Sequence, residues 1–99
     1  MYRIKQTDVF SKWLKKLKDI QGKVSILRRI ERTKSGNFGD HKPVGDTVYE
    51  LRITVGPGYR VYYTLKNDEL VMLLIGGNKS SQNNDIAKAK QLAKELQDE

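Results

Sequence analysis

Cysteine, histidine and long apolar runs are scarce or missing in this chain of 99 residues, and each absence removes a class of function. Without any cysteine, disulfides, thiolate nucleophiles and cysteine-ligated zinc sites are excluded. His41 is the only histidine, which excludes ribonuclease chemistry that needs two of them. No apolar run approaches the roughly 20 residues that span a bilayer, and no secretory hydrophobic segment is present. We therefore expect one soluble, cytoplasmic domain over residues 1–99, without membrane association.

Motifs of the common enzyme classes are missing too. The serines are not set in a nucleophile elbow, and the eight glycines form neither a P-loop nor a dinucleotide-binding fingerprint. The acidic residues are scattered without the spacing of Mg²⁺ ligands. We therefore expect no metal and no cofactor, and we interpret His41 as a residue of a surface loop.

Positive charge is abundant and unevenly placed. Nineteen Lys and Arg against twelve Asp and Glu give a formal net charge of +7, and residues 1–36 alone hold eleven basic and three acidic side chains. Such an excess is typical of a protein with a polyanionic partner. It also fits an ordinary solvated helical face, so the first third is either such a face or a surface that binds phosphates or an acidic protein.

The N-terminal third is predicted to form a strand and two helices. Residues 2–6 alternate between apolar and polar side chains, which indicates a short strand. Thr7 or Asp8 can cap a following helix, whose apolar positions recur every three or four residues. We place a break at Gly22 and the end of a second helix near Gly36, which together predict a helical hairpin.

The rest of the chain is predicted to form three strands and a helix. Residues 46–55 and 59–65 alternate around a Gly-Pro-Gly turn and indicate an antiparallel hairpin. Residues 70–77 are apolar on both faces, which is typical of a central strand covered on two sides. A C-terminal amphipathic helix follows, with Asn83 or Asn84 as its cap. The order is strand, helix, helix, three strands, helix.

The outer face of the predicted hairpin of strands carries the candidate chemistry. Glu50, Arg52, Arg60 and Tyr62 share this face, opposite the apolar one, and the loop after the last strand is expected to bring Lys79 to its rim. Arginine binds phosphate oxygens in a bidentate manner and tyrosine rings stack on unpaired bases, so this set suits single-stranded RNA. The simpler alternative is a group of exposed strand residues without a ligand.

Five segments of the chain carry a family resemblance. They are DVFSKWLKKLKD (8–19), RIERTKSGNFGDHKPVG (29–45), YELRI (49–53), GPGYRVYY (56–63) and GGNKSSQNNDI (76–86). In order and spacing they resemble the RelE/ParE toxin superfamily, close to the HigB-like addiction module killer proteins. The resemblance implies an α+β fold in which a strand and helical hairpin pack on a mostly antiparallel four-stranded sheet with a C-terminal helix. It also implies the toxin half of a type II toxin–antitoxin pair.

The resemblance implies roles for individual residues. Arg60 matches the family's transition-state arginine, which would stabilise charge on the scissile phosphate. Lys79 falls where RelE-like toxins place a basic residue that protonates the leaving 5′ oxygen. Arg52 and Glu50 stand where RelE has lysines, and an arginine is a poor general base because its pKa exceeds about 12. We therefore consider Glu50 as the base, with a cross-strand ion pair to Arg60 as its alternative use.

A further group of residues is expected to bind RNA. One of the two strand tyrosines would stack on or orient a base, and the basic first third would dock on ribosomal RNA. The expected RNA-binding residues are Tyr59, Tyr62, Ser80, Gln82, Lys12, Lys15, Lys16, Arg28 and Arg29. The hypothesis requires that the guanidinium groups of Arg52 and Arg60 and the ammonium of Lys79 converge on one open concavity.

The expected function is a metal-independent, ribosome-dependent mRNA endoribonuclease that inhibits translation. Its expected partners are mRNA, the ribosome and a helix-turn-helix antitoxin of the HigA type. Two alternatives stay open, namely a ParE-like inhibitor of DNA gyrase and a non-catalytic basic module that binds RNA or the antitoxin.

Overall fold

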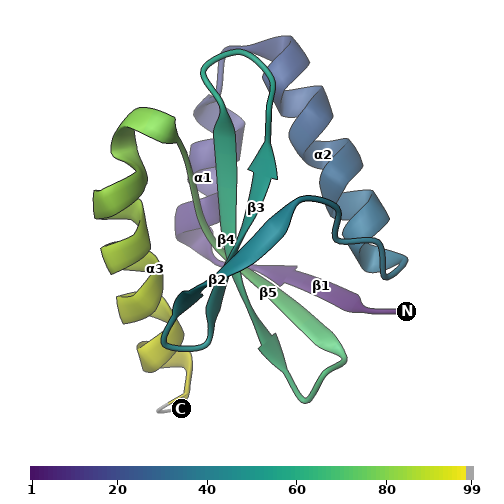
Figure 1. The fold of residues 1–99 in the computed structure, drawn as a ribbon, viewed down its shortest axis with the longest axis vertical. Helices are drawn as coiled ribbons and strands as arrows, with labels where there is room; N and C mark the ends of the chain where they lie inside the picture. The colour runs from purple at the N-terminus through teal and green to yellow at the C-terminus, as the bar shows by residue number, and fades with distance from the viewer. Residues whose placement is uncertain (98–99) are drawn as a thin grey trace.

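A mixed five-stranded sheet forms the centre of the protein, and the computed structural model describes it with the surrounding helices over residues 1–97 (Figure 1). Across the sheet the strands follow the order β1-β5-β4-β3-β2, and all neighbours are antiparallel except β1 and β5. The strands are β1 (Arg3–Gln6), β2 (His41–Gly45), β3 (Val48–Ile53), β4 (Tyr59–Lys66) and β5 (Leu70–Asn78). The predicted α+β fold is confirmed, with one strand more than the four expected.

Helices cover both faces of this sheet. The helical elements are α1 (Asp8–Lys16), α2 (Ile20–Lys34), the short 3₁₀ turn η1 (Lys79–Ser81) and α3 (Gln82–Gln97). Helices α1 and α2 form the predicted hairpin, and Figure 1 shows α3 on the other side of the molecule from α2. No helix of the described residues combines the length and the hydropathy needed to cross a membrane.

The strand β2 is the element that the sequence analysis missed. It lies at the sheet edge, pairs only with β3, and leaves four of its five residues exposed, so it has no alternating pattern. Pro43 lacks a backbone N–H, which an edge strand tolerates. The expectation that His41 lies in a loop was therefore wrong, although the residue is exposed as expected. Pairing of β2 with β3 places Lys42 directly opposite Glu50.

The two turns that begin the helices of the hairpin are fixed by side-chain caps. Thr7 Oγ1 accepts a hydrogen bond of 3.0 Å from the Phe10 N–H, which confirms the predicted cap of α1. Helix α2 begins at Ile20 because Asp19 Oδ1 accepts a 3.1 Å hydrogen bond from the Gly22 N–H. The predicted break at Gly22 was wrong, since this residue lies in the first turn of α2.

The C-terminal helix also begins differently from the prediction. Asn78 Oδ1 accepts hydrogen bonds from the Ser80 and Ser81 N–H groups at 2.9 and 3.2 Å, and η1 then continues into α3 at Gln82. The expected cap at Asn83 or Asn84 was wrong because the chain is already helical there. A short 3₁₀ turn before a helix leaves no apolar period by which the sequence could show it.

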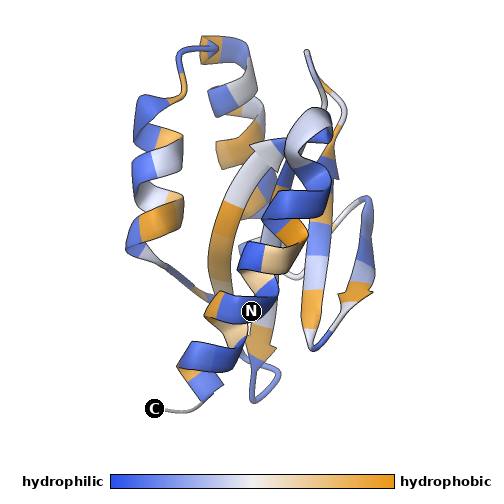
Figure 2. Ribbon diagram, turned by 90° about the vertical axis from the view of Figure 1, so that its left-hand side faces the viewer, coloured by the Kyte–Doolittle hydropathy of each residue, from blue (hydrophilic) through white to orange (hydrophobic). Residues whose placement is uncertain are grey.

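Two hydrophobic cores lie on the two faces of the sheet. The larger one packs α1 and α2 on residues such as Leu51, Val61 and Tyr63, and the smaller one packs Ala89 and Ala93 of α3 on the opposite face. In Figure 2 blue and orange segments alternate along the helices, as expected of helices that face the sheet on one side and solvent on the other. The prediction that the last strand is central and covered on both sides is confirmed.

Two consecutive glycines at the end of β5 bring the helices of both layers close to the sheet. A Cβ atom at Gly76 would overlap the ring of Trp13 on α1, and one at Gly77 would overlap the Asp85 carboxylate at the start of α3. The neighbouring Ser81 hydroxyl would lie only 2.8 Å from the same added atom on Gly77. The absence of side chains at both positions therefore determines how closely the two layers approach.

Candidate functional site

A buried carboxylate surrounded by three cations is the main charged feature of the sheet. Strand pairing builds it, because Lys42 lies opposite Glu50 between β2 and β3, and Arg52 lies opposite Arg60 between β3 and β4. All four side chains belong to the sheet face that α3 partly covers, together with Tyr62. We call these four residues the Glu50 cluster.

Glu50 is fully buried, and among residues 1–97 its carboxylate forms hydrogen bonds and ion pairs only with three cations and one amide. Arg60 Nη1 donates to Oε1 at 2.7 Å, and Gln82 Nε2 donates to the same oxygen at 3.4 Å. Lys42 Nζ and Arg52 Nε lie 3.7 and 4.0 Å from Oε2. A buried carboxylate stays ionised only when it is paired, which these contacts provide. The ion pair with Arg60 that the sequence suggested is therefore present.

The Glu50 cluster carries more positive than negative charge. Three cations share one carboxylate, and the exposed fractions of the Arg60, Arg52 and Lys42 side chains are 14, 34 and 46 %, so the cluster becomes more accessible from β4 towards β2. Arg52 and Arg60 lie directly opposite each other on neighbouring strands. Like charges in such a pair destabilise the sheet. Within residues 1–97 the buried Nε atoms of both arginines have no hydrogen-bond partner. The Glu50 Oε2 atom, 4.0 Å from Arg52 Nε, is buried without a hydrogen bond as well, so an anion could approach this cluster only through the exposed parts of its three cationic side chains.

The two strand tyrosines do not present their rings as expected. Tyr62 is fully buried beneath α3, and burial together with the nearby Glu50 carboxylate raises the pKa of its phenol. Tyr59 is also buried, and its hydroxyl donates to Asp19 Oδ2 at 2.7 Å. Burial and that hydrogen bond raise the pKa of Tyr59. The expectation of an open face on which either ring could stack a base was wrong, because each ring belongs to a core.

The loop after β5 lies at the same end of the sheet as the arginines. Arg60 pairs with Gly77, and exposed Lys79 follows two residues later at the start of η1. A Cβ atom built on Gly58 would lie 3.8 Å from Lys79 Cβ. The base of the Lys79 side chain is therefore close to the turn between β3 and β4. Among the described residues Lys79 takes part in no ion pair. Ser80 is exposed beside it, and its hydroxyl donates to Asn78 Oδ1.

The other predicted RNA-binding residues form a separate surface. They lie on α1 and α2, against the opposite face of the sheet from the Glu50 cluster. Arg29 is partly buried there, and its Nη1 donates to the Asp40 backbone oxygen at 3.3 Å, while the others are exposed or nearly so. These residues are Lys12, Lys15, Lys16, Arg28 and Arg29. The structure therefore does not bring them together with Arg60.

Lys42 is the member of the Glu50 cluster that sequence reasoning missed. Its place opposite Glu50 depends on β2, which has almost no strand pattern. The one available signal is the turn sequence Gly45, Asp46 and Thr47 directly before the alternating residues 48–53, since glycine and aspartate favour tight turns. Asp46 and Thr47 have positive φ angles of 53° and 66°, as a two-residue hairpin turn of this kind requires.

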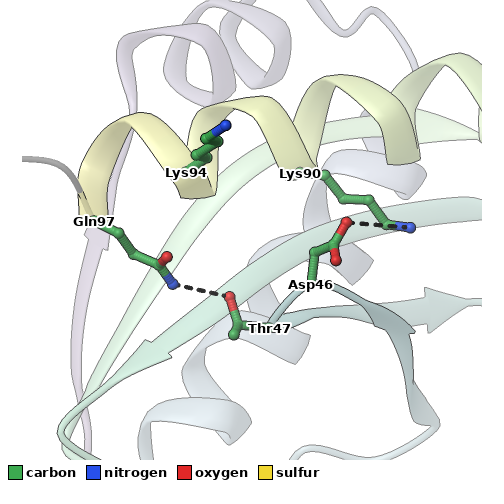
Figure 3. Close-up of a pocket in the computed structure, with 5 residues that line it drawn as sticks. All are labelled: Asp46, Thr47, Lys90, Lys94 and Gln97. Atoms are coloured by element: carbon green, nitrogen blue, oxygen red, sulfur yellow. Dashed lines mark hydrogen bonds and ion pairs between the residues drawn. The ribbon is translucent and has the colours of Figure 1, made fainter.

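A polar pocket lies between this turn and the C-terminal half of α3 (Figure 3). It has a volume of about 430 Å³ and is lined by Asp46, Thr47, Lys90, Lys94 and Gln97. Lys90 Nζ lies 3.9 Å from Asp46 Oδ2, and Gln97 Nε2 donates to Thr47 Oγ1 at 3.2 Å, so these contacts hold the helix end on the turn. Within the part of the chain that the structure describes, no three His, Asp or Glu residues gather as metal ligands would.

Three known proteins are similar to this chain in sequence or in fold. The chain is 53 % identical over 94 residues to an uncharacterised protein of Haemophilus influenzae, covering 95 % of each chain. Its fold matches a chain of the intact E. coli RelBE toxin–antitoxin complex with a TM-score of 0.60 at 19 % identity, covering 79 % of this chain and 96 % of that one. The conserved hypothetical protein HP0894 of Helicobacter pylori gives a TM-score of 0.47 at 20 % identity, with 81 % and 97 % covered.

A family model gives the assignment. The model for phage-derived Gp49-like proteins (DUF891) matches residues 12–97, which is most of the chain. This region includes both arginines of the Glu50 cluster and the loop that carries Lys79. The protein belongs to the family of phage-derived Gp49-like proteins, and the α+β fold implied by its resemblance to the RelE/ParE superfamily agrees with the fold that it shares with the RelBE chain.

Proposed function

We propose that the protein is the toxin of a type II toxin–antitoxin pair and that it cleaves mRNA on the ribosome, in the cytoplasm, without a metal ion. The observation that carries the proposal is the Glu50 cluster, in which Arg52 and Arg60 face each other beside one carboxylate and Arg52 keeps 34 % of its side chain exposed. Guanidinium groups placed side by side match the oxygens of a phosphodiester. The fold shared with a chain of the RelBE toxin–antitoxin complex supports the same interpretation.

The reaction that fits these groups is a transesterification. The 2′ oxygen attacks the neighbouring phosphorus while its proton passes to water. The bond from phosphorus to the 5′ oxygen breaks, and the products end in a 2′,3′-cyclic phosphate and a 5′ hydroxyl. Arg52 and Arg60 bind the non-bridging oxygens and stabilise the negative charge that grows in the transition state. Lys79, exposed at the same end of the sheet, donates a proton to the leaving 5′ oxygen.

Glu50 is a positioning residue in this proposal. Its carboxylate is fully buried and already bound to Arg60, so it holds the guanidinium in place and is not available to accept a proton from the substrate. The cluster then lacks a base of its own for the 2′ hydroxyl. This supports dependence on the ribosome, which would hold the mRNA in a geometry ready for in-line attack.

An antitoxin is the proposed protein partner. A solved structure that shares this fold is described as a toxin–antitoxin complex, which supports such a partner for this chain. We propose a helix-turn-helix protein of the HigA type encoded by the neighbouring gene. Complex formation between the two purified proteins tests this part of the proposal directly.

Mapping of the 5′ ends of transcripts after brief expression tests the activity. The wild-type protein should arrest growth and create new 5′-hydroxyl ends inside coding sequences. Arg60→Gln should reduce this cleavage at least about a hundredfold, because loss of one charge-stabilising donor has an effect of that size. Arg3→Gln is the matched control, since Arg3 is an exposed strand arginine paired only with Glu69.

Three results would contradict the proposal in different ways. Growth arrest with a DNA-damage response and intact transcripts would indicate gyrase inhibition. Growth arrest with neither would indicate a non-catalytic binding protein. Wild-type cleavage by an Arg60→Gln protein whose circular dichroism shows a native fold would leave the ribonuclease activity in place but refute the site.

A further inference from the structure

Helix α2 exposes a line of large aliphatic side chains. Ile20, Val24 and Leu27 are 77, 40 and 47 % exposed, although Ile26 of the same helix is fully buried in the core. Steps of four and three residues place the three side chains on one side of the helix. Single exposed aliphatic residues are ordinary, but a line of three along one helix is typical of a surface that binds another protein.

A groove runs beside this line. It has a volume of about 330 Å³ and lies between α2 and Val55, in the loop that joins β3 to β4. Its walls combine aliphatic and polar groups, and they are formed by Ile20, Gln21, Val24, Ser25, Arg28 and Val55. A groove that combines aliphatic side chains with one cationic group is suited to the apolar face of an amphipathic helix that also carries carboxylates.

The charge around the groove selects the kind of partner. Residues 8–34, which make up α1 and α2, contain nine basic and three acidic side chains. One of those acidic residues, Asp19, is engaged as a helix cap and as the acceptor for Tyr59. None of the ion pairs among residues 1–97 involves a side chain of α1 or α2. The positive charge here forms no ion pair within the described part of the chain, so the surface is complementary to a negatively charged partner.

Two other occupants fit this surface less well. A second copy of the chain would bring the same cations against each other, and like charges at an interface are unfavourable. A nucleic acid would neutralise the cations but would leave the aliphatic line without apolar contact. An acidic amphipathic helix satisfies both the charge and the apolar surface.

We propose that Ile20, Val24, Leu27 and Arg28, here named the α2 docking surface, bind an acidic amphipathic helix of the partner protein encoded beside this chain. The inference rests on the proposed function in that this partner is the antitoxin. Because α2 and the Glu50 cluster lie against opposite faces of the sheet, the partner binds without filling the cluster. It would then neutralise the toxin by covering the basic surface that approaches the ribosome.

Isothermal titration calorimetry with the purified neighbouring gene product tests the inference. Leu27→Glu should weaken the complex at least about thirtyfold, since a central apolar contact of an interface has an effect of that size. Arg28→Glu should weaken it too and should reduce the salt dependence of the dissociation constant. Val9→Glu is the matched control, because Val9 is 36 % exposed on α1 outside the groove, and its change should stay below about threefold.

The outcomes separate this inference from the proposed function, because calorimetry does not depend on toxicity. A complex that depends on Leu27, formed by a wild-type protein that neither arrests growth nor cleaves mRNA, would support the docking surface and refute the toxin. Conversely, the docking surface is refuted if a toxic wild-type protein binds its partner equally well with Leu27→Glu, or forms no complex with it. It is also refuted if Leu27→Glu weakens binding to ribosomes but not to the partner protein.

Discussion

Replacing Arg60 should test how strongly the Glu50 cluster depends on its ion pair. The Arg60→Gln change removes the closest cation, whose Nη1 lies 2.7 Å from Glu50 Oε1, and leaves a fully buried carboxylate with weaker partners. Removal of one partner of a buried ion pair costs about 3–5 kcal/mol. Lys42 and Arg52 remain within 4.0 Å, so we expect the lower figure, about 3 kcal/mol. For a domain of this size that loss lowers the melting temperature by roughly 12–24 °C.

A double-mutant cycle separates the pair from its surroundings. Glu50→Gln alone leaves three cations without their shared carboxylate, and it should also destabilise the fold. The double variant, with glutamine at both positions, carries no unpaired buried charge at the pair and should recover part of the combined loss. We expect a coupling energy of about 2 kcal/mol between the two substitutions.

Urea unfolding followed by far-ultraviolet circular dichroism gives the four free energies of the cycle. Arg3→Gln is the control, because the Arg3 pair with Glu69 is exposed and its loss should cost under about 0.5 kcal/mol. A cost below about 1 kcal/mol for Arg60→Gln, or additive costs in the cycle, would refute the view that Glu50 is buried as a charged group. The result also decides whether a loss of toxicity in Arg60 variants reports on chemistry or on folding.

Three further substitutions test other parts of the fold. Gly22→Ala should lower the free energy of unfolding by about 1–3 kcal/mol in urea titration, since the added methyl would overlap the Tyr59 ring. The hydrogen bonds from the Gly22 N–H and the Tyr59 hydroxyl lower the pKa of Asp19 below its ordinary value of 3.8. Its stabilising contribution is therefore present above that value and is lost as the pH falls through the lower folded-state pKa. Asp19→Asn should flatten the fall of stability with acid below pH 3.8. Thr47→Gly should raise the melting temperature, because a β-branched residue at a φ of 66° is strained. The free energy of unfolding should increase by up to about 1 kcal/mol. An unchanged or lower melting temperature would show that the hydrogen bond from Gln97 to Thr47 contributes more than the strain costs.

The two strands of the predicted hairpin, β3 and β4, could be predicted from the sequence. The alternation of apolar and polar residues along each strand shows directly which side chains lie on which face of the sheet. Tyr49 and Leu51 point into the larger core as predicted, while Val48 and Glu50 point to the other face. A hairpin built on this alternation also places Arg52 beside Arg60 without further information. The central part of the candidate site was therefore predictable from local pattern alone.

The environment of that site was not predictable in the same way. The apolar residues of α3 show that it is amphipathic, but they do not say which surface it covers, so the burial of Tyr62 could not be read from its strand. The small residues Ala89 and Ala93 were the one indication in the sequence that α3 packs closely on the sheet, since small side chains allow a helix to lie near a sheet. Lys42 was hidden for a different reason, because an exposed edge strand needs no apolar alternation.

Gly76 and Gly77 have a consequence for how the two sides of the molecule communicate. At these positions only the strand backbone separates Trp13 of α1 from Asp85 of α3, so the sheet offers no side-chain layer that could absorb a displacement. A shift at the first turn of α3, beside the arginines, would press on the main chain that also supports the basic helices. The proposed cleavage site and the proposed partner-binding surface lie on opposite faces of the sheet. At Gly76 and Gly77 only the strand backbone would separate them, so a displacement on one face would be transmitted to the other.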